Sequence, residues 1–141
     1  MKVREIMSTD VQRISSSAMV SEAAEKMRVF NIGCLPILED NKIVGMLTDR
    51  DIVIRAIAAG SNPRMTIIKD IFTPNIIRCY EDDDIETAAT IMEVHRVRRL
   101  VVIRNDNSVA GILSLGDLAS KANIDHLTYE IMERVCEPVR G

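Results

Sequence analysis

The sequence predicts an α/β fold, of the α+β kind, made of two pseudo-symmetric repeats that each follow the element order βαββα. Two observations predict it. The stretch Gly45–Ile52 (GMLTDRDI) returns 66 residues later as Gly111–Leu118 (GILSLGDL), and the residues upstream of both stretches correspond at an offset of 65. Two copies are too few for a stacked solenoid, so we expect a pair of repeats that share one core.

The correspondence fixes the expected boundaries. One extra residue in the turn at 105–108 accounts for the change of offset. The aligned pairs include Ile6 with Ile71, Arg13 with Arg78, Met27 with Met92 and Leu35 with Leu100. We expect a first repeat at 1–60, a linker at 61–67, a second repeat at 68–122 and a helical tail at 123–141.

The first repeat opens with two short apolar segments, Val3–Met7 and Val11–Ile14, and the second of these is a candidate strand. Serines at positions 15–17 offer caps for an amphipathic helix. Helical spacing predicts that its buried face carries Val20, Ala23, Ala24, Met27 and Phe30. Asn31 and Gly33 follow, and both tolerate the left-handed backbone that ends a helix.

A hairpin and a second helix complete the first repeat. Cys34–Leu38 and Ile43–Leu47 are aliphatic runs separated by a polar turn of hairpin length. The second run leads through Thr48 into a helix that we expect to include Ile52–Ile57 and to end at Gly60.

The second repeat follows the same plan. Its predicted elements are an apolar opening at Ile68–Phe72, a strand at Ile76–Cys79, a helix that buries Ile85, Ala88, Ala89 and Met92, a hairpin of Leu100–Ile103 and Val109–Leu113, and a helix from Leu118. The acidic run Glu81–Asp84 suits the positive end of the first of these helices, and Asp84 can cap it; a metal site is the alternative. The tail carries an apolar stripe at Ile124, Leu127, Ile131 and Val135. We expect this stripe to cover either this chain's core or a partner subunit.

Composition narrows the class of protein. With 47% hydrophobic and 28% charged residues, the 141-residue chain is close to the average soluble domain. It has no apolar window of membrane-spanning length and no signal-peptide pattern, so we expect a cytoplasmic protein without a membrane partner. The net charge of −3 gives no bulk attraction for nucleic acid. The few cysteines and histidines are scattered along the chain: Cys34, Cys79, Cys136, His95 and His126. This scatter predicts structural thiols and no metal centre.

The repeated stretch places a hydroxyl residue three positions before an acid, where a strand becomes a helix. Thr48 precedes Asp51, and Ser114 precedes Asp117. This spacing is typical of a capping box, in which the two side chains satisfy backbone N–H groups at the helix start. It equally suits ligand binding, because an ionised carboxylate can accept both hydroxyls of a ribose while the hydroxyl and nearby N–H groups receive a phosphate. The two roles can coexist.

Two βαββα units that each end in Gly-aliphatic-aliphatic-(Ser/Thr)-x-x-Asp-aliphatic resemble the cystathionine β-synthase (CBS) domain family. The resemblance covers about residues 3–57 and 68–119. Together with Ile32–Ile37, the Gly45–Ile52 stretch is similar to small stand-alone CBS proteins of bacteria and archaea, including the hypoxic response protein type. The resemblance implies a Bateman module: two repeats with two clefts, binding AMP, ADP, ATP or S-adenosylmethionine, and commonly pairing as a homodimer.

The resemblance also implies roles for individual residues. Asp51 and Asp117 would hold ribose hydroxyls, Thr48 and Ser114 would contact ribose or phosphate, and the segments near Ile14, Pro36, Ile77 and Val101 would flank the base. Where the first repeat has Pro36, the second has Val101, which distinguishes the two base-binding positions.

The two motifs differ in their basic residues. Arg50 lies between the hydroxyl and the acid of the first motif, where the second has Leu115-Gly116, and a guanidinium can bind phosphate in a bidentate way. An exposed helix charge is the alternative role. Arg98 and Arg99 precede the Leu100 strand, and the resemblance makes them candidates to neutralise a polyphosphate; a solvated or dimer-facing charge cluster is the alternative.

These observations favour a non-catalytic regulatory module that binds an adenosine-containing ligand and signals through altered packing or association to an unknown partner. The sequence lacks a nucleophile beside a base, a lysine-containing P-loop and a metal-ligand pair, which argues against an enzyme. A ligand-free oligomeric adaptor that binds other proteins is the second hypothesis. Nucleic-acid binding is the least favoured.

Overall fold

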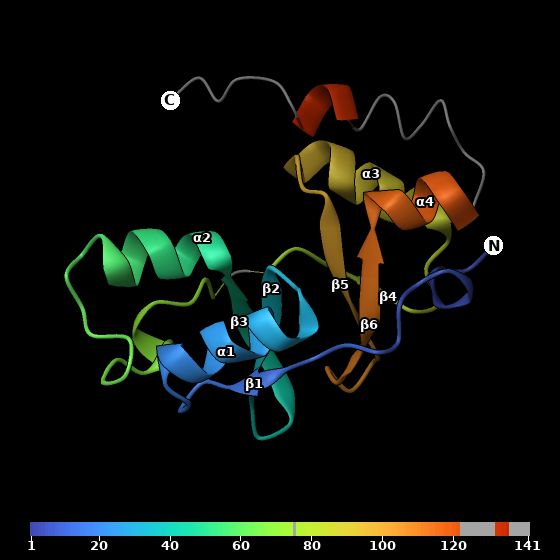
Figure 1. Ribbon diagram of the computed structural model, residues 1–141. Helices are drawn as coiled ribbons and strands as arrows, with labels where there is room; N and C mark the ends of the chain where they lie inside the picture. Colours follow the sequence, from blue (N-terminus) through green and yellow to red (C-terminus); the bar gives the residue numbers. More distant parts are fainter. Residues whose placement is uncertain (75, 122–131, 136–141) are drawn as a thin grey trace. The chain divides into compact units, whose positions relative to one another are not determined.

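The computed structural model describes residues 1–74, 76–121 and 132–135 (Figure 1). The chain divides into two compact units. One, the first-repeat unit, comprises Gln12–Ile76, and the other, the second-repeat unit, comprises Met1–Val11 together with Ile77–Gly141. Each contains a three-stranded mixed sheet with helices packed against it, which confirms the predicted fold class.

The sheet of the first-repeat unit has the order β1-β2-β3 (Ile14–Ser15, Cys34–Glu39 and Lys42–Thr48). β1 runs parallel to β2, and β2 pairs antiparallel with β3 with an irregularity between Ile37 and Leu38. The helical segments are α1 (Val20–Phe30), the short α2 (Asp49–Asp51), which continues as the π-helical η2 (Ile52–Ile57), and the 3-10 helix η3 (Ile68–Asp70). This second helix ends at Ile57, three residues before the predicted end at Gly60, which has a φ of 77°.

The sheet of the second-repeat unit repeats this topology with β4 (Arg78–Tyr80), β5 (Arg99–Ile103) and β6 (Val109–Ser114). Again the first strand is parallel and the last antiparallel to the central one, and the hairpin irregularity recurs between Val102 and Ile103. The helical segments are the 3-10 helix η1 (Val3–Glu5), α3 (Ile85–His95) and α4 (Leu115–Lys121).

The opening segments of the two repeats are exchanged. η1 precedes the first repeat in sequence, yet Val3 and Ile6 are buried in the core of the second-repeat unit. η3 precedes the second repeat, yet Ile68 and Ile71 are buried in the core of the first-repeat unit. Sequence repeat and compact unit are therefore different divisions of the chain.

Each exchanged segment crosses its sheet at the glycine that opens the repeated stretch. Thr73 forms a bridge with Met46 on β3, and Ser8 forms the matching bridge with Ile112 on β6. A Cβ atom on Gly45 would lie 2.3 Å from the Phe72 ring and 2.4 Å from the Thr73 carbonyl oxygen. One on Gly111 would lie 2.5 Å from the carbonyl oxygen of Ser8. Only glycine leaves room for the backbone to pass this closely.

The first helix of each repeat differs in what it buries. All four predicted residues of α3 are buried, whereas on α1 only Val20, Ala23 and Met27 are. The prediction was wrong for Ala24 and Phe30, which are exposed; Phe30 is the last residue of α1.

The ends of α1 also differ in part from expectation. The N-cap is Met19, whose N–H donates to Glu22 Oε2 at 3.0 Å, and not one of the three serines. Asn31 ends the helix in the left-handed conformation, as predicted, with φ of 52°; the equivalent Arg96 ends α3 with φ of 55°.

The acidic run before α3 pairs with basic residues. Asp82 forms an ion pair with Arg4, and Asp84 with Lys2 at 3.1 Å, so both anchor the exchanged N-terminal segment. Asp84 occupies the N-cap position, but its side chain makes no capping hydrogen bond. Of the predicted tail stripe, Val135 packs against the second-repeat core, while Ile124, Leu127 and Ile131 lie outside the described residues, as do His126 and Cys136.

Candidate functional site

The repeated stretches form two matching reciprocal capping boxes. In the first-repeat unit the Asp51 N–H donates to Thr48 Oγ1 at 3.0 Å, and the Thr48 N–H donates to Asp51 Oδ2 at 2.9 Å. In the second-repeat unit the Asp117 N–H donates to Ser114 Oγ at 3.0 Å, and the Ser114 N–H donates to Asp117 Oδ2 at 2.9 Å. The capping interpretation is therefore confirmed in both repeats.

The capping bonds leave part of each carboxylate available. Asp51 and Asp117 keep 13% and 16% of their side-chain surface exposed. A carboxylate has about four lone-pair positions, of which the cap uses one. The second oxygen of each faces a basic residue four positions on: Asp51 Oδ1 lies 3.8 Å from Arg55 Nε, and Asp117 Oδ1 lies 3.2 Å from Lys121 Nζ. Each acid can accept further hydrogen bonds while remaining capped.

The basic residues near the two motifs differ as the sequence indicates. Arg50 is exposed on α2, two residues after Thr48. Arg99 pairs in register with Ser114 across β5 and β6, at the position where the first repeat has Cys34 opposite Thr48. The carbonyl oxygen of Arg98 accepts the Leu115 N–H at 2.8 Å. The structure therefore brings Arg98 and Arg99 beside the second motif.

The residues predicted to flank a base lie on or just before the other two strands of each sheet. Ile14 is on β1 and pairs with Ile37, so β2 separates it from Thr48 on β3. Pro36 is buried on β2 and pairs with Met46. In the second-repeat unit, Val101 is buried on β5 and Ile77 packs partly buried against the core. Pro36 and Val101 thus lie on the strand next to each motif, opposite the residues two positions before its hydroxyl, while Ile14 lies one strand further away.

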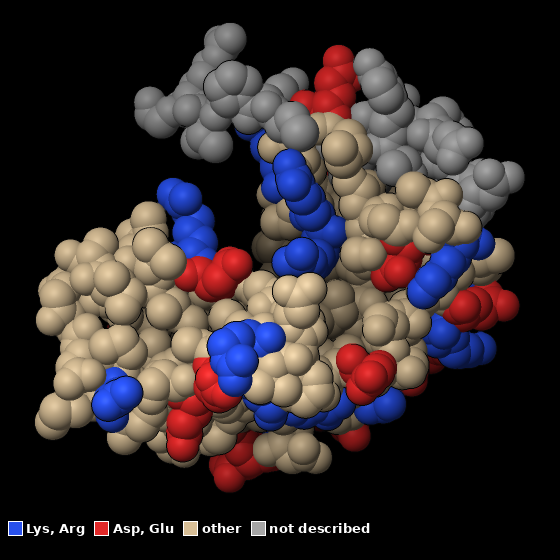
Figure 2. All heavy atoms as spheres, viewed as in Figure 1, with Lys and Arg blue, Asp and Glu red and all other residues tan. Residues whose placement is uncertain are grey.

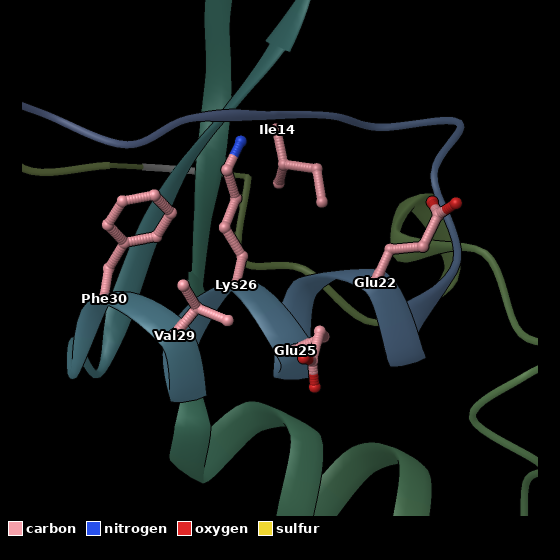
Figure 3. A pocket seen from close by; sticks show the side chains of 6 residues that line it. All are labelled: Ile14, Glu22, Glu25, Lys26, Val29 and Phe30. Carbon is pink, nitrogen blue, oxygen red and sulfur yellow. The ribbon is translucent and has the colours of Figure 1, made fainter.

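Ile14 instead lines an open pocket of about 420 Å³ between β1 and α1. Its other lining residues are Glu22, Glu25, Lys26, Val29 and Phe30. Lys26 rises from α1 beside Ile14 (Figure 3), and its Nζ donates to the Arg13 carbonyl oxygen at 2.7 Å. Glu25 is paired with Arg28 at 2.5 Å. The charged groups of this pocket have partners in the chain, and no motif residue reaches it.

Other chemistries find little support among the described residues. Burial raises the pKa of the Cys79 thiol to about 12, helped by the nearby Asp83 carboxylate, so this thiol stays protonated at neutral pH. Across residues 1–74, 76–121 and 132–135, no three His, Cys, Asp or Glu side chains gather as a metal site would require. In Figure 2 basic and acidic side chains both occur across the face, and one group of basic side chains lies over β5. None of the described helices has the length and apolar character needed to span a membrane.

Sequence reasoning missed two residues that form ion pairs with the motif acids, Arg55 and Lys121. Their spacing was a usable indication, because residues four apart on a helix are neighbours and an acid followed by a base is the favourable order. They are equivalent in the repeat, 66 residues apart. Both repeats therefore carry a positive charge at this position. The match is easy to overlook because one repeat has arginine and the other has lysine.

Comparison with known proteins identifies the class. The family model of the CBS domain matches residues 3–57 and 68–123, so the chain belongs to the CBS domain family and carries two copies of the domain. Each copy supplies one mixed sheet and one hydroxyl-acid capping box.

Particular relatives extend over nearly the whole chain. Hypoxic response protein 1 of Mycobacterium tuberculosis is 33% identical over 137 residues, covering 96% of this chain and 94% of the relative. The crystal structure of Hypoxic Response Protein I with two coordinated zinc ions matches with a TM-score of 0.78 and 34% identity, covering 86% of this chain and 98% of that one. The CBS domain pair of protein MJ0100, in complex with 5-methylthioadenosine and S-adenosyl-L-methionine, matches with a TM-score of 0.75 and 27% identity, covering 87% and 96%.

Proposed function

We propose that this protein is a cytoplasmic, non-catalytic regulatory module that binds an adenosine-containing ligand at its two hydroxyl-acid motifs. AMP, ADP, ATP and S-adenosylmethionine are the candidate ligands. Occupancy changes how the protein associates with itself or with a regulated protein. The MJ0100 domain pair, whose structure holds two adenosine compounds, supports the ligand class.

The observation that carries the proposal is the partly exposed, incompletely used carboxylate of each capping box. Asp51 and Asp117 are fixed by their caps and still have acceptor capacity for the two hydroxyls of a ribose. Thr48 and Ser114 lie at the same helix starts and are our proposed contacts to ribose or phosphate.

The charged neighbours suggest that the two sites have different preferences. We propose that Arg50 serves the first site, and that Arg98 and Arg99 serve the second, as contacts to phosphate. Ile14, Pro36, Ile77 and Val101 are the proposed base-flanking residues. Two arginines near Ser114 favour a more anionic ligand there than at Thr48.

The test is a thermal-shift panel of AMP, ADP, ATP, S-adenosylmethionine, NAD and GTP, with and without magnesium, on the parent and on Asp51→Asn and Asp117→Asn. Asparagine retains an oxygen for the capping bond and loses the charge, whereas alanine would also remove the cap, at a cost of about 1 kcal/mol. A ligand at 100 times its Kd adds about 2.7 kcal/mol, which raises the melting temperature by several degrees. We expect each variant to lose part of that shift and the double variant to lose all of it.

Asp10→Asn, at an exposed acid outside both motifs, is the matched control and should respond like the parent. A parent shift that survives in the double variant would show that the sites lie elsewhere. A parent that responds to none of the six compounds would favour the second hypothesis, a ligand-free adaptor that works through protein contacts.

We also propose that the protein forms a homodimer. Five exposed apolar side chains on the helices of the first-repeat unit support this: Val29, Phe30, Val53, Ile54 and Ile57. A set of this size on neighbouring helices is typical of an interaction surface.

A further inference from the structure

Arg55 and Lys121 each join a motif acid to an exchanged segment. Besides facing Asp51, Arg55 donates from Nη1 to the carbonyl oxygens of Ile71 at 3.1 Å and Phe72 at 3.4 Å, and to Thr73 Oγ1 at 3.3 Å. These three acceptors belong to the segment that follows η3. The Arg55 guanidinium thus lies between the candidate ligand site and the exchanged segment.

The second-repeat unit repeats the arrangement with a different residue. Lys121 Nζ lies 3.2 Å from Asp117 Oδ1 and donates to the Ile6 carbonyl oxygen at 3.3 Å. Ile6 and Ile71 are equivalent in the repeat, and they are the C-cap residues of η1 and η3. The same bridge therefore occurs twice, built once from arginine and once from lysine, which indicates that the positive charge and reach matter more than the side-chain type.

The bridges lie where the exchanged segments are attached to their sheets. Two residues beyond each C-cap, Thr73 donates to the Met46 carbonyl oxygen at 2.9 Å, and Ser8 donates to that of Ile112 at 2.9 Å. Met46 and Ile112 are two residues before the hydroxyl of their motif. The acid, the base and the segment form one connected cluster within each unit.

We propose that Arg55 and Lys121 are positioning residues that couple ligand binding at each motif acid to the ordering of the exchanged segment in the same unit. The proposal rests on the proposed function. Lys121 holds the second oxygen of Asp117 at 3.2 Å, and the Arg55 guanidinium attracts that of Asp51 across 3.8 Å, so each acid is biased to present its remaining lone pairs in one orientation. The same cation holds the segment's carbonyl oxygen, so the two are ordered together.

The direction of the effect follows from linkage. A ribose diol binds best to the acid whose orientation the cation maintains, so the ligand favours the state in which the bridge is intact. Coupling is reciprocal: ligand at Asp51 stabilises residues 71–73, and loosening these residues weakens ligand binding. Asp117 and residues 6–8 are coupled in the same way. The exchanged segments are thereby the part of each unit that reports occupancy.

The experiment combines hydrogen exchange of peptides covering 1–8 and 68–74 with calorimetric binding of AMP, or of S-adenosylmethionine where the thermal-shift panel selects it. In the parent we expect ligand to slow exchange in both peptides. Arg55→Met keeps the aliphatic stem and removes the donors. It should weaken binding at the first site roughly fivefold, which is the lower end of typical coupling factors because the ion pair is half-exposed. It should also abolish ligand-dependent protection of residues 68–74 and leave that of residues 1–8 intact.

Two further variants separate positioning from mere stabilisation. Arg55→Lys copies the residue found at position 121 and should restore both binding and protection. Lys69→Met removes an exposed charge from the same segment and should leave both unchanged. Faster exchange in Arg55→Met with parent affinity and parent protection by ligand would overturn the coupling and leave the proposed function standing. A parent that binds none of the panel overturns the proposed function, and the coupling with it.

Discussion

Positions 45 and 111 require glycine because of a close contact with a segment from the other repeat. At each, the space for a side chain is taken by the exchanged segment, Phe72 and Thr73 in one unit and Met7 and Ser8 in the other. The repeated glycine therefore marks the crossing point of that segment and is not needed for the turn into the following helix. The same position is a convenient place to test the exchange.

Gly45→Ala should destabilise the protein, because the new methyl group meets backbone that cannot move away without breaking the Thr73 bridge. Overpacking of this kind costs about 2 kcal/mol, which corresponds to a fall of several degrees in melting temperature measured by circular dichroism. Gly116→Ala is the matched control, since the nearest atom to its Cβ lies 3.6 Å away and alanine favours the helix. Equal melting temperatures for Gly45→Ala and the parent would contradict the packing described.

The sequence identified the residues of each capping box but did not distinguish capping from ligand binding. Both roles use the same hydroxyl, carboxylate and backbone N–H groups, so residue type and spacing are identical for the two. The structure separates them only by showing which acceptor positions of Asp51 and Asp117 remain after capping. The roles of Arg50, Arg98 and Arg99 stay predictions for the same reason, because position alone does not reveal a ligand.

At the scale of elements, the hairpins and long helices were predictable because their periodicity is local. The first strand of each repeat was not placed accurately. We expected Val11–Ile14 and Ile76–Cys79, whereas β1 comprises Ile14–Ser15 and β4 comprises Arg78–Tyr80. These are edge strands paired only to β2 and β5, so their limits depend on a neighbour distant in sequence rather than on their own residues.

The exchange of η1 and η3 was also beyond sequence reasoning. A buried apolar pattern indicates that a segment packs against something, but it does not identify which of two similar sheets receives it. Ile6 and Ile71 occupy equivalent positions and bury equivalent surface, so the pattern of Val3–Met7 fits both sheets equally.

A fragment of residues 12–76 should therefore fold better than one of residues 1–60. The first contains Ile68 and Ile71, which are buried in the same core as Val20 and Leu35, and the second lacks them. Burial of two isoleucines contributes about 3 to 6 kcal/mol, a large share of the stability of a domain this small. Cooperative thermal unfolding is expected for 12–76 only.

Circular dichroism of both fragments at equal concentration checks this. Ile68→Ala with Ile71→Ala in the 12–76 fragment should abolish its cooperative transition. If residues 1–60 melted as cooperatively as residues 12–76, the sequence repeat would be the folding unit after all.

At the scale of the whole molecule, the two repeats differ most in the surface of their helices. Val53 and Ile57 are 57% and 55% exposed on η2. Phe30, Val53 and Ile54 correspond to His95, Ala119 and Ser120 in the second repeat. Only the first-repeat unit thus presents a broad apolar helical surface among the described residues, and the proposed homodimer uses that surface.

Val53→Asp combined with Ile57→Asp should convert the dimer to a monomer, because two charges would lose their hydration at the interface. Sedimentation velocity over a range of concentrations measures the change. Val94→Asp, at an exposed valine of the second repeat equivalent to Val29, is the control and should remain dimeric. A parent that sediments as a monomer at all concentrations, or a double variant that stays dimeric, would refute the proposed interface.

Because of the exchanged segments, the two repeats should not depend on the peptide link between them to stay together. A backbone cut between Gly60 and Thr66, near the exposed Met65, would yield two polypeptides that each leave an anchor buried in the other. Val3 and Ile6 of the first piece lie in the second-repeat core, and Ile68 and Ile71 of the second piece lie in the first-repeat core. We therefore expect the two pieces to stay associated, so that nicking by a protease at this loop would not release either repeat and the chain could be divided there for split-protein reconstitution.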